Sequence, residues 1–73
     1  MRIKIEGCTA EALNDYCSYL TLSKEYEVVR DCYADGELLE IIDDDGDTVA
    51  ALMSHPEVTC AHLPSGAKWV TVG

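Results

Sequence analysis

The sequence predicts a mainly β protein, a small antiparallel barrel that is closed or nearly closed, on three observations. Apolar and polar residues alternate over short runs, which is typical of half-buried strands. Turn-forming residues separate these runs at regular intervals, as they do in small barrels. The chain has 73 residues, of which 48% are hydrophobic, and this length leaves room for a single domain, residues 1–73, with one small core.

The first part of the chain predicts one strand and one short helix. In "RIKIEG", Ile3 and Ile5 alternate with charged residues and Gly7 ends the strand. The next stretch, "TAEALNDYCSYL", begins at Thr9, a favourable N-cap residue, and has an acid in its first turn. A short helix or an ordered loop is therefore expected. Its apolar stripe follows helical spacing: Leu13, Tyr16, Cys17 and Leu20.

From residue 24 onward the pattern is one of strands and turns. "EYEVV", "LLEII", "TVAALM" and "AKWVTV" are the strand candidates. "ADGE" predicts a turn centred on Asp35 and Gly36, because Asp-Gly adopts turn conformations readily. Pro56 and Pro64 make the segment between them irregular or part of an edge. The expected core consists of these residues: Ile3, Ile5, Tyr26, Val28, Leu39, Ile41, Val49, Ala51, Trp69, and Val70 or Val72.

Charge is distributed unevenly along the chain. Fourteen acidic and five basic residues give a formal net charge of −9. Residues 1–30 contain five acids and four bases, whereas residues 31–67 contain nine acids and no lysine or arginine. Such a surface repels nucleic acid phosphates and attracts basic surfaces. We therefore expect no direct binding to nucleic acid; the alternative to a basic protein partner is that the acids only keep the protein in solution.

The stretch "LLEIIDDDGDTVAAL" places four aspartates and a glycine between two apolar runs. A calcium-binding EF-hand loop needs ligands at positions 1 and 12 when glycine is at position 6. With Gly46 at that position, the two ligand positions hold Ile41 and Leu52, so the calcium motif fails. A hairpin explains the stretch better, because Asp45 and Gly46 supply the positive φ angles of a tight turn. We expect the aspartates at a solvated hairpin tip.

A resemblance extends over most of the chain. The run "YLTLSKEYEVV … LLEIIDDDGDTVAAL … HLPSGAKWVTV" (19–72) resembles small phage and prophage proteins of unknown function, whose pattern is "LT-x-GK-x-YEV", then "IIDDDG" and a closing strand. The resemblance implies an SH3-like barrel, a viral origin and the cytoplasm of a bacterial host, with no catalytic set attached. Ser23 stands where the pattern has glycine, so this first turn is expected to differ.

The sequence carries no pattern typical of an enzyme. It has no G-x-S-x-G, phosphate-binding glycine loop or H-E-x-x-H, so we predict no catalytic residue, cofactor or metal. No apolar run approaches the roughly 18 residues of a membrane span. The stretch "MRIKIEGC" does not have the apolar run of a signal peptide, so we expect no secretion signal. The four cysteines are therefore expected as thiols. One alternative is a structural zinc module, in which Cys60 and His62 share a strand face and His55 with one more cysteine completes the site.

The sequence thus predicts a small acidic accessory protein, a monomer, that binds and modulates a host protein with a basic surface. Host RNA polymerase is the first candidate partner, because it has basic nucleic-acid channels, and a defence nuclease is the next. An alternative is a nucleic-acid mimic that fills a DNA-binding groove. The partner-binding residues are expected to be six acids: Glu37, Glu40, Asp43, Asp44, Asp45 and Asp47.

Overall fold

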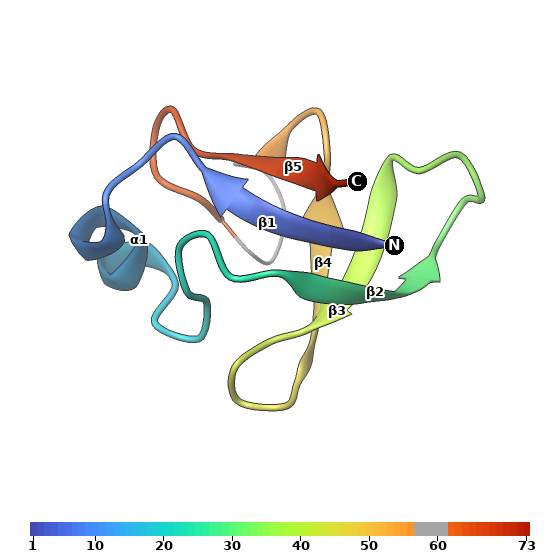
Figure 1. Ribbon diagram of the computed structural model, residues 1–73, viewed down its shortest axis with the longest axis horizontal. Coiled ribbons are helices and arrows are strands. Elements are labelled where there is room, and N and C mark those ends of the chain that lie inside the picture. Colours follow the sequence, from blue (N-terminus) through green and yellow to red (C-terminus); the bar gives the residue numbers. More distant parts are fainter. Residues whose placement is uncertain (57–61) are drawn as a thin grey trace.

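Five antiparallel strands and one short helix make up the described part of the chain, so the predicted mainly β fold is confirmed. The computed structural model describes residues 1–56 and 62–73 (Figure 1). The strands form one sheet in the order β4-β3-β2-β1-β5. The bounds of the elements are β1 Arg2–Glu6, α1 Ala10–Tyr16, β2 Tyr26–Asp31, β3 Leu38–Ile42, β4 Thr48–Leu52 and β5 Lys68–Val72.

Strand β2 divides the sheet into two halves. Its first half pairs with β1, with Tyr26 opposite Ile3, and its second half pairs with β3, with Val28 opposite Ile41. The register shifts between Val28 and Arg30, a bulge of the kind that bends a strand and increases its twist. The two halves of the sheet therefore differ in direction, and in the view of Figure 1 β3 and β4 run across the direction of β1 and β5.

The predicted barrel is not closed. Strands β4 and β5 are the two edges of the sheet, and within the described residues they do not pair with each other. Pro56 and Pro64 stand in the connection between them, and proline cannot donate a ladder hydrogen bond. Helix α1 and residues 62–67 lie at one end of the bent sheet (Figure 1) and contribute buried side chains to its core.

Helix α1 begins where the sequence predicts. The Thr9 side chain accepts a hydrogen bond from the backbone N–H of Ala12 at 3.1 Å, the expected N-cap contact. Leu13, Cys17 and Leu20 are buried, but Tyr16 is 57% exposed, so its place in the apolar stripe is wrong. The helix ends at Tyr16, and this side chain packs against residues 62–67 instead of the sheet.

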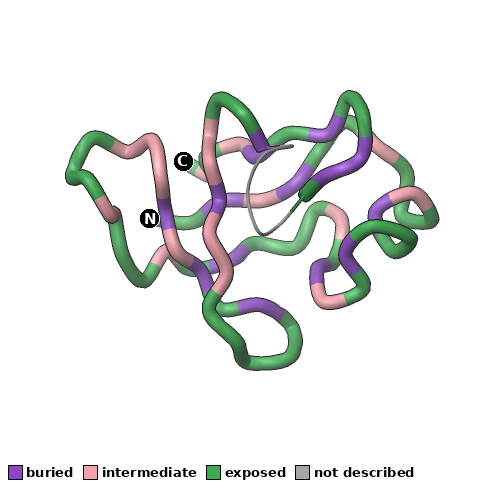
Figure 2. The backbone as a smooth tube through the Cα atoms, turned by 180° about the vertical axis from the view of Figure 1, so that it is seen from behind, coloured by how far each residue is buried: buried purple, intermediate pink, exposed green. Residues whose placement is uncertain are grey.

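The core matches the sequence prediction along four strands and departs from it in the fifth. Seven predicted residues are buried: Ile3, Ile5, Tyr26, Leu39, Ile41, Ala51 and Trp69. Val28 and Val49 are partly buried against them. Val70 and Val72 are not in the core, because they alternate with Trp69 and lie opposite Lys4 and Arg2. Figure 2 shows buried and exposed stretches alternating along the chain.

The connection between β2 and β3 is longer than the tight turn expected at "ADGE". It spans residues 32–37 and contains two residues with positive φ, Ala34 at 59° and Gly36 at 78°. Two acids organise it from within: Asp31 Oδ2 accepts from the Gly36 N–H at 3.0 Å, and Asp35 Oδ1 accepts from the Glu37 N–H at 2.9 Å. These side-chain contacts add to a backbone hydrogen bond at the base of the loop, from the Cys32 N–H to the Leu38 carbonyl at 3.0 Å.

Candidate protein-binding surface

The acidic stretch forms the connection between β3 and β4, as predicted, with a different turn geometry. The Gly46 N–H donates to the Asp43 carbonyl at 3.2 Å, and the Asp43 N–H donates to the Asp47 carbonyl at 2.9 Å. Gly46 has the expected positive φ, +87°. Asp45 does not: in the described chain, the non-glycine residues with positive φ are Ser23 and Ala34. The connection is a four-residue turn followed by a glycine bulge, a common three-residue hairpin loop.

Asp43 holds this turn together from the inside. Its side chain is buried, with 8% of the residue exposed. Its Oδ1 atom accepts hydrogen bonds from the backbone N–H groups of Asp45 and Asp47, each at 2.9 Å. These are the contacts by which aspartate stabilises turns. The expectation that all four aspartates are solvated is therefore wrong for Asp43.

Asp44 docks the turn onto the segment before β2. One carboxylate oxygen accepts from the Thr21 hydroxyl at 2.6 Å, and the other from the Lys24 ammonium at 2.5 Å and the Tyr26 hydroxyl at 3.0 Å. The Asp44 backbone N–H donates to the Tyr19 carbonyl at 2.9 Å. These four side chains, Thr21, Lys24, Tyr26 and Asp44, form what we call the Asp44 cluster.

The Asp44 cluster changes the acidity of its members. Burial acts to raise the pKa of Asp44, but the hydrogen bonds from Lys24, Thr21 and Tyr26 outweigh it, so this pKa lies below its usual value. The hydrogen bond to Asp44 raises the pKa of Lys24. Both groups are charged at neutral pH, and Asp44 is thereby neutralised within the molecule.

Glu37 and Glu40 are also engaged, and they lie away from the turn. Glu37 Oε1 accepts from the Ser54 hydroxyl and from the Ser54 N–H, the latter at 3.1 Å. Glu40 forms an ion pair with Arg30 at 3.5 Å. Glu37 lies at the opposite end of β3 from the turn, about 17 Å away at about 3.3 Å per strand residue. The six predicted acids therefore do not form one patch.

Asp45 and Asp47 are the two predicted residues whose charges remain available. Both are exposed. Neither carboxylate accepts a hydrogen bond or forms an ion pair within the part of the chain that the structure describes. We call these two carboxylates the acidic tip.

Exposed apolar side chains lie beside the turn and at the β2 bulge that pairs with β3. Ile42 immediately precedes the turn and is 42% exposed, and Val29, at the β2 bulge, is 53% exposed. Thr48 lies opposite Ile42 and Ala50 lies opposite Glu40 on the face that points away from the core. This outer face of the hairpin combines a partly apolar surface with negative charge at one end.

Most basic residues are already paired within the molecule. Four of the five basic residues form ion pairs: Arg2, Lys4, Lys24 and Arg30. The unpaired acidic residues therefore have few basic residues left to neutralise them. Lys68 begins β5, the opposite edge of the sheet from β4.

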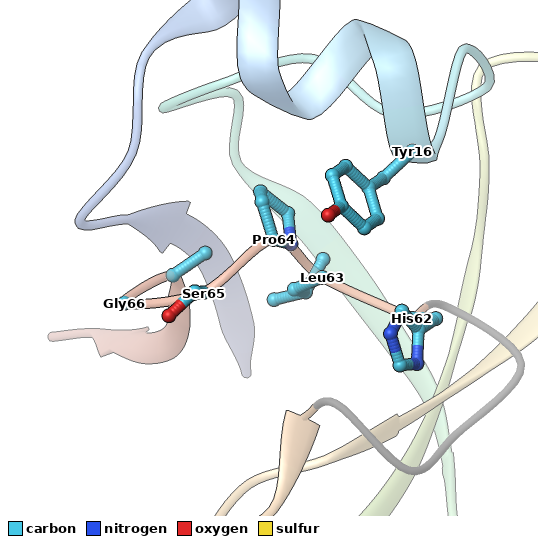
Figure 3. A pocket seen from close by; sticks show the side chains of 7 residues that line it. Tyr16, His62, Leu63, Pro64, Ser65 and Gly66 are labelled. Carbon is cyan, nitrogen blue, oxygen red and sulfur yellow. The ribbon is translucent and has the colours of Figure 1, made fainter.

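A pocket of about 430 Å³ lies between the end of α1 and residues 62–67. Figure 3 shows Tyr16 above this segment and His62 at one end of it; their rings stack with centroids 6.0 Å apart. No hydrogen bond joins Ser65 to His62 in the described chain, so the pocket lacks the nucleophile–base contact of hydrolytic sites. The absence of enzymatic activity stays a prediction.

The cysteines do not form a metal cluster in the region that is described. Cys8, Cys17 and Cys32 are free thiols, and no three potential ligands gather in residues 1–56 and 62–73. Cys17 donates from Sγ to the His62 carbonyl at 3.1 Å, and burial raises the pKa of its thiol. Cys60 lies outside the described residues, so the zinc alternative stays a prediction.

No helix within residues 1–56 and 62–73 has the length and apolar character needed to cross a membrane. No protein-family model, curated protein or solved structure matches this chain.

Proposed function

We propose that this protein acts by binding a basic surface of another protein, through the acidic tip and the neighbouring outer face of the β3–β4 hairpin. The observation that carries the proposal is that Asp45 and Asp47 are exposed and have no partner among residues 1–56 and 62–73, while Asp43 and Asp44 are engaged within the fold. Charges left free in this way attract an oppositely charged partner and orient it during encounter.

The apolar residues beside the acidic tip support the same proposal. Protein interfaces combine an apolar centre with a polar rim. Ile42 and Val29 are exposed large hydrophobic residues on or near the hairpin. Charge would bring a basic partner to the tip, and burial of these side chains would then slow its dissociation.

On the resemblance given above, we propose that the partner is a protein of the bacterium that a phage infects. Bacterial RNA polymerase is the first candidate and a defence nuclease the second. A nucleic-acid mimic is the alternative. Asp43 and Asp44 accept hydrogen bonds within the fold, so fewer carboxylates of the turn are available to imitate a row of phosphates. Excess duplex DNA should displace the protein from its partner under the mimic hypothesis and leave a complex at another surface intact.

The test is a titration of purified bacterial RNA polymerase with labelled protein, followed by fluorescence anisotropy at two salt concentrations. We expect binding that weakens with salt. The variant Asp45→Asn/Asp47→Asn should bind about tenfold more weakly, which corresponds to about 1.4 kcal/mol.

The matched control is Glu11→Gln/Asp15→Asn, which also removes two charges from exposed residues, but on α1. Its affinity should change less than that of the tip variant. Equal losses from both variants would show that net charge alone acts. If the polymerase does not bind, the same pair of variants applied to proteins captured from a bacterial lysate decides between the tip and net charge.

A further inference from the structure

Among the described residues, nothing pairs with the outer edge of strand β4, which lies next to the acidic tip. At the two ends of the hairpin, the Asp43 N–H bonds to the Asp47 carbonyl and the Met53 N–H bonds to the Glu37 carbonyl. Hydrogen-bonded pairs alternate along an antiparallel ladder. Val49 and Ala51 therefore direct their N–H and C=O groups toward β3.

The intervening residues direct their backbone groups the other way. Thr48, Ala50 and Leu52 alternate with the hydrogen-bonded positions, so their N–H and C=O groups face outward from the sheet. No described residue bonds to these groups. The edge thus offers three donors and three acceptors in a row to another extended segment.

The composition of β4 does not block such pairing. Natural edge strands are commonly protected by lysine, proline or another charged residue. Strand β4, with the sequence TVAAL, contains none of these, whereas β5, the other edge, begins with Lys68. The unprotected edge is therefore the one that adjoins the acidic tip.

Charge selects the occupant of this edge. A second copy of the chain would bring a net charge of −9 against the same charge, and repulsion disfavours that contact. A basic segment is attracted, because a strand laid along β4 passes Asp47 at one end and the Glu37–Ser54 contact at the other. Alternate side chains of an added strand point to opposite faces, so apolar residues can pack beside Val49 while basic residues face the solvent.

We infer that β4 binds an extended segment of its partner, with alternating basic and apolar residues, as a sixth strand of the sheet. This inference rests on the proposed binding of a basic partner and specifies how the contact is made. Recognition by strand addition takes its affinity from main-chain hydrogen bonds and its selectivity from alternate side chains.

Amide hydrogen exchange, read residue by residue by NMR, tests the inference. The probe is an end-blocked peptide, Lys-Val-Lys-Val-Lys-Val-Lys, and the control is Lys-Pro-Lys-Pro-Lys-Pro-Lys, which has the same charge and fewer N–H donors. Without peptide, the Thr48, Ala50 and Leu52 amides should exchange quickly and those of Val49 and Ala51 slowly. The valine peptide at saturation should slow exchange of the first three at least about tenfold, and the proline peptide should not.

A backbone variant provides the second measurement. Thr48→Pro removes an outward N–H at the first residue of an edge strand, where proline is tolerated, and Thr48→Val keeps that N–H. We expect affinity for the valine peptide to fall several-fold in the proline variant and to hold in the valine variant, with thermal midpoints confirming that both fold. The exchange data need no variant, so a proline variant that unfolds leaves the test decisive.

The outcomes separate the inference from the proposed function. Equal binding of both peptides without new amide protection would overturn strand addition and leave attraction to the acidic tip in place. If the variant Asp45→Asn/Asp47→Asn keeps both the amide protection of β4 and its affinity for the valine peptide, strand addition is upheld. The same result would show that the acidic tip does not contribute to it. No binding of the valine peptide at low salt would overturn the inference, while the polymerase and lysate measurements decide the proposed function independently.

Discussion

Asp43 and Asp45 stand two residues apart in one turn, and the fold uses them in opposite ways. Asp43 is buried and its carboxylate accepts two backbone hydrogen bonds, whereas the carboxylate of Asp45 is exposed and unpaired in the described structure. Asp44 and Asp47 repeat the contrast: Asp44 accepts a hydrogen bond from Lys24, while Asp47 is exposed and its carboxylate has no partner among the described residues. A run of like charges is therefore not one functional unit.

Turn geometry explains the difference. Asp43 occupies the first position of a turn whose fourth residue is Gly46, and aspartate there can cap the backbone N–H groups that follow. Asp44, the next residue, faces the segment before β2, and Asp45 faces solvent. Two carboxylates, those of Asp43 and Asp44, accept hydrogen bonds within the fold, and in the described structure the two others do not. Replacing each in turn tests this division.

The largest effect is expected for Asp43→Ala. It removes the acceptor of two backbone N–H groups in a buried position, and the cost should be about 1–3 kcal/mol of unfolding free energy. Asp43→Asn keeps a carbonyl oxygen at this place and should cost less. Urea denaturation measures both, and an unchanged midpoint for the alanine variant would show that the turn does not depend on Asp43.

Replacement of Asp44 should have a smaller effect that depends on pH. Because the pKa of Asp44 in the folded protein lies below its ordinary value of 3.8, the unfolded chain binds the proton more readily than the folded one. The contribution to stability is therefore complete above that value and is lost as the pH falls through the folded pKa. Asp44→Asn should lower stability by about 1 kcal/mol at pH 7 and flatten the acid limb of the stability curve.

The control for this experiment is the partner residue. Lys24→Gln removes the main cation of the Asp44 cluster and should also weaken the dependence on acid. If both variants keep the wild-type loss of stability below about pH 4, other carboxylates produce it and Asp44 does not lock the turn.

A gain of stability is expected at Ser23, beside the segment that receives Asp44. Ser23 has φ of 64°, a left-handed conformation that costs most residues about 1–2 kcal/mol and glycine very little. Glycine also loses more freedom on folding, so Ser23→Gly should stabilise by about 0.5–1 kcal/mol net. Ala34→Gly is the matched variant, with φ of 59° in the β2–β3 loop. Thermal midpoints that fall in both variants would contradict this reasoning.

The strands were predictable because their signal is local. Alternation identified the core-facing residues of β1, β3 and β4, and Thr9 identified the start of α1. Val70 and Val72 were wrongly predicted to be in the core because the alternation in "AKWVTV" does not show which face of the strand is buried. Their true face follows from Trp69, which is buried beside Tyr26. The sequence left open whether the barrel is closed or nearly closed, because closure depends on which distant strands pair, and in the described residues β4 and β5 do not.

The candidate surface was only partly predictable. Charge composition pointed to the turn that carries the acidic tip. The Asp44 cluster, however, joins residues 18 to 23 positions apart, and no local pattern encodes such contacts. The free edge of β4 could not be foreseen at all, because edges are defined only by strand order.

The smallest change in stability is expected from the variant Asp45→Asn/Asp47→Asn, and it completes the comparison. Because neither carboxylate is engaged in the described structure, the unfolding free energy should stay within about 0.5 kcal/mol of the wild type. Reduced repulsion between neighbouring acids would favour a slight rise. The proposed function requires the same variant to lose affinity for a basic partner and part of the salt dependence of binding. Asp43→Asn provides the reverse profile, since it should lower stability and retain the two free charges. If instead the tip variant is destabilised by more than about 1 kcal/mol, its carboxylates serve the fold, and the division of the turn into two structural and two free aspartates is wrong.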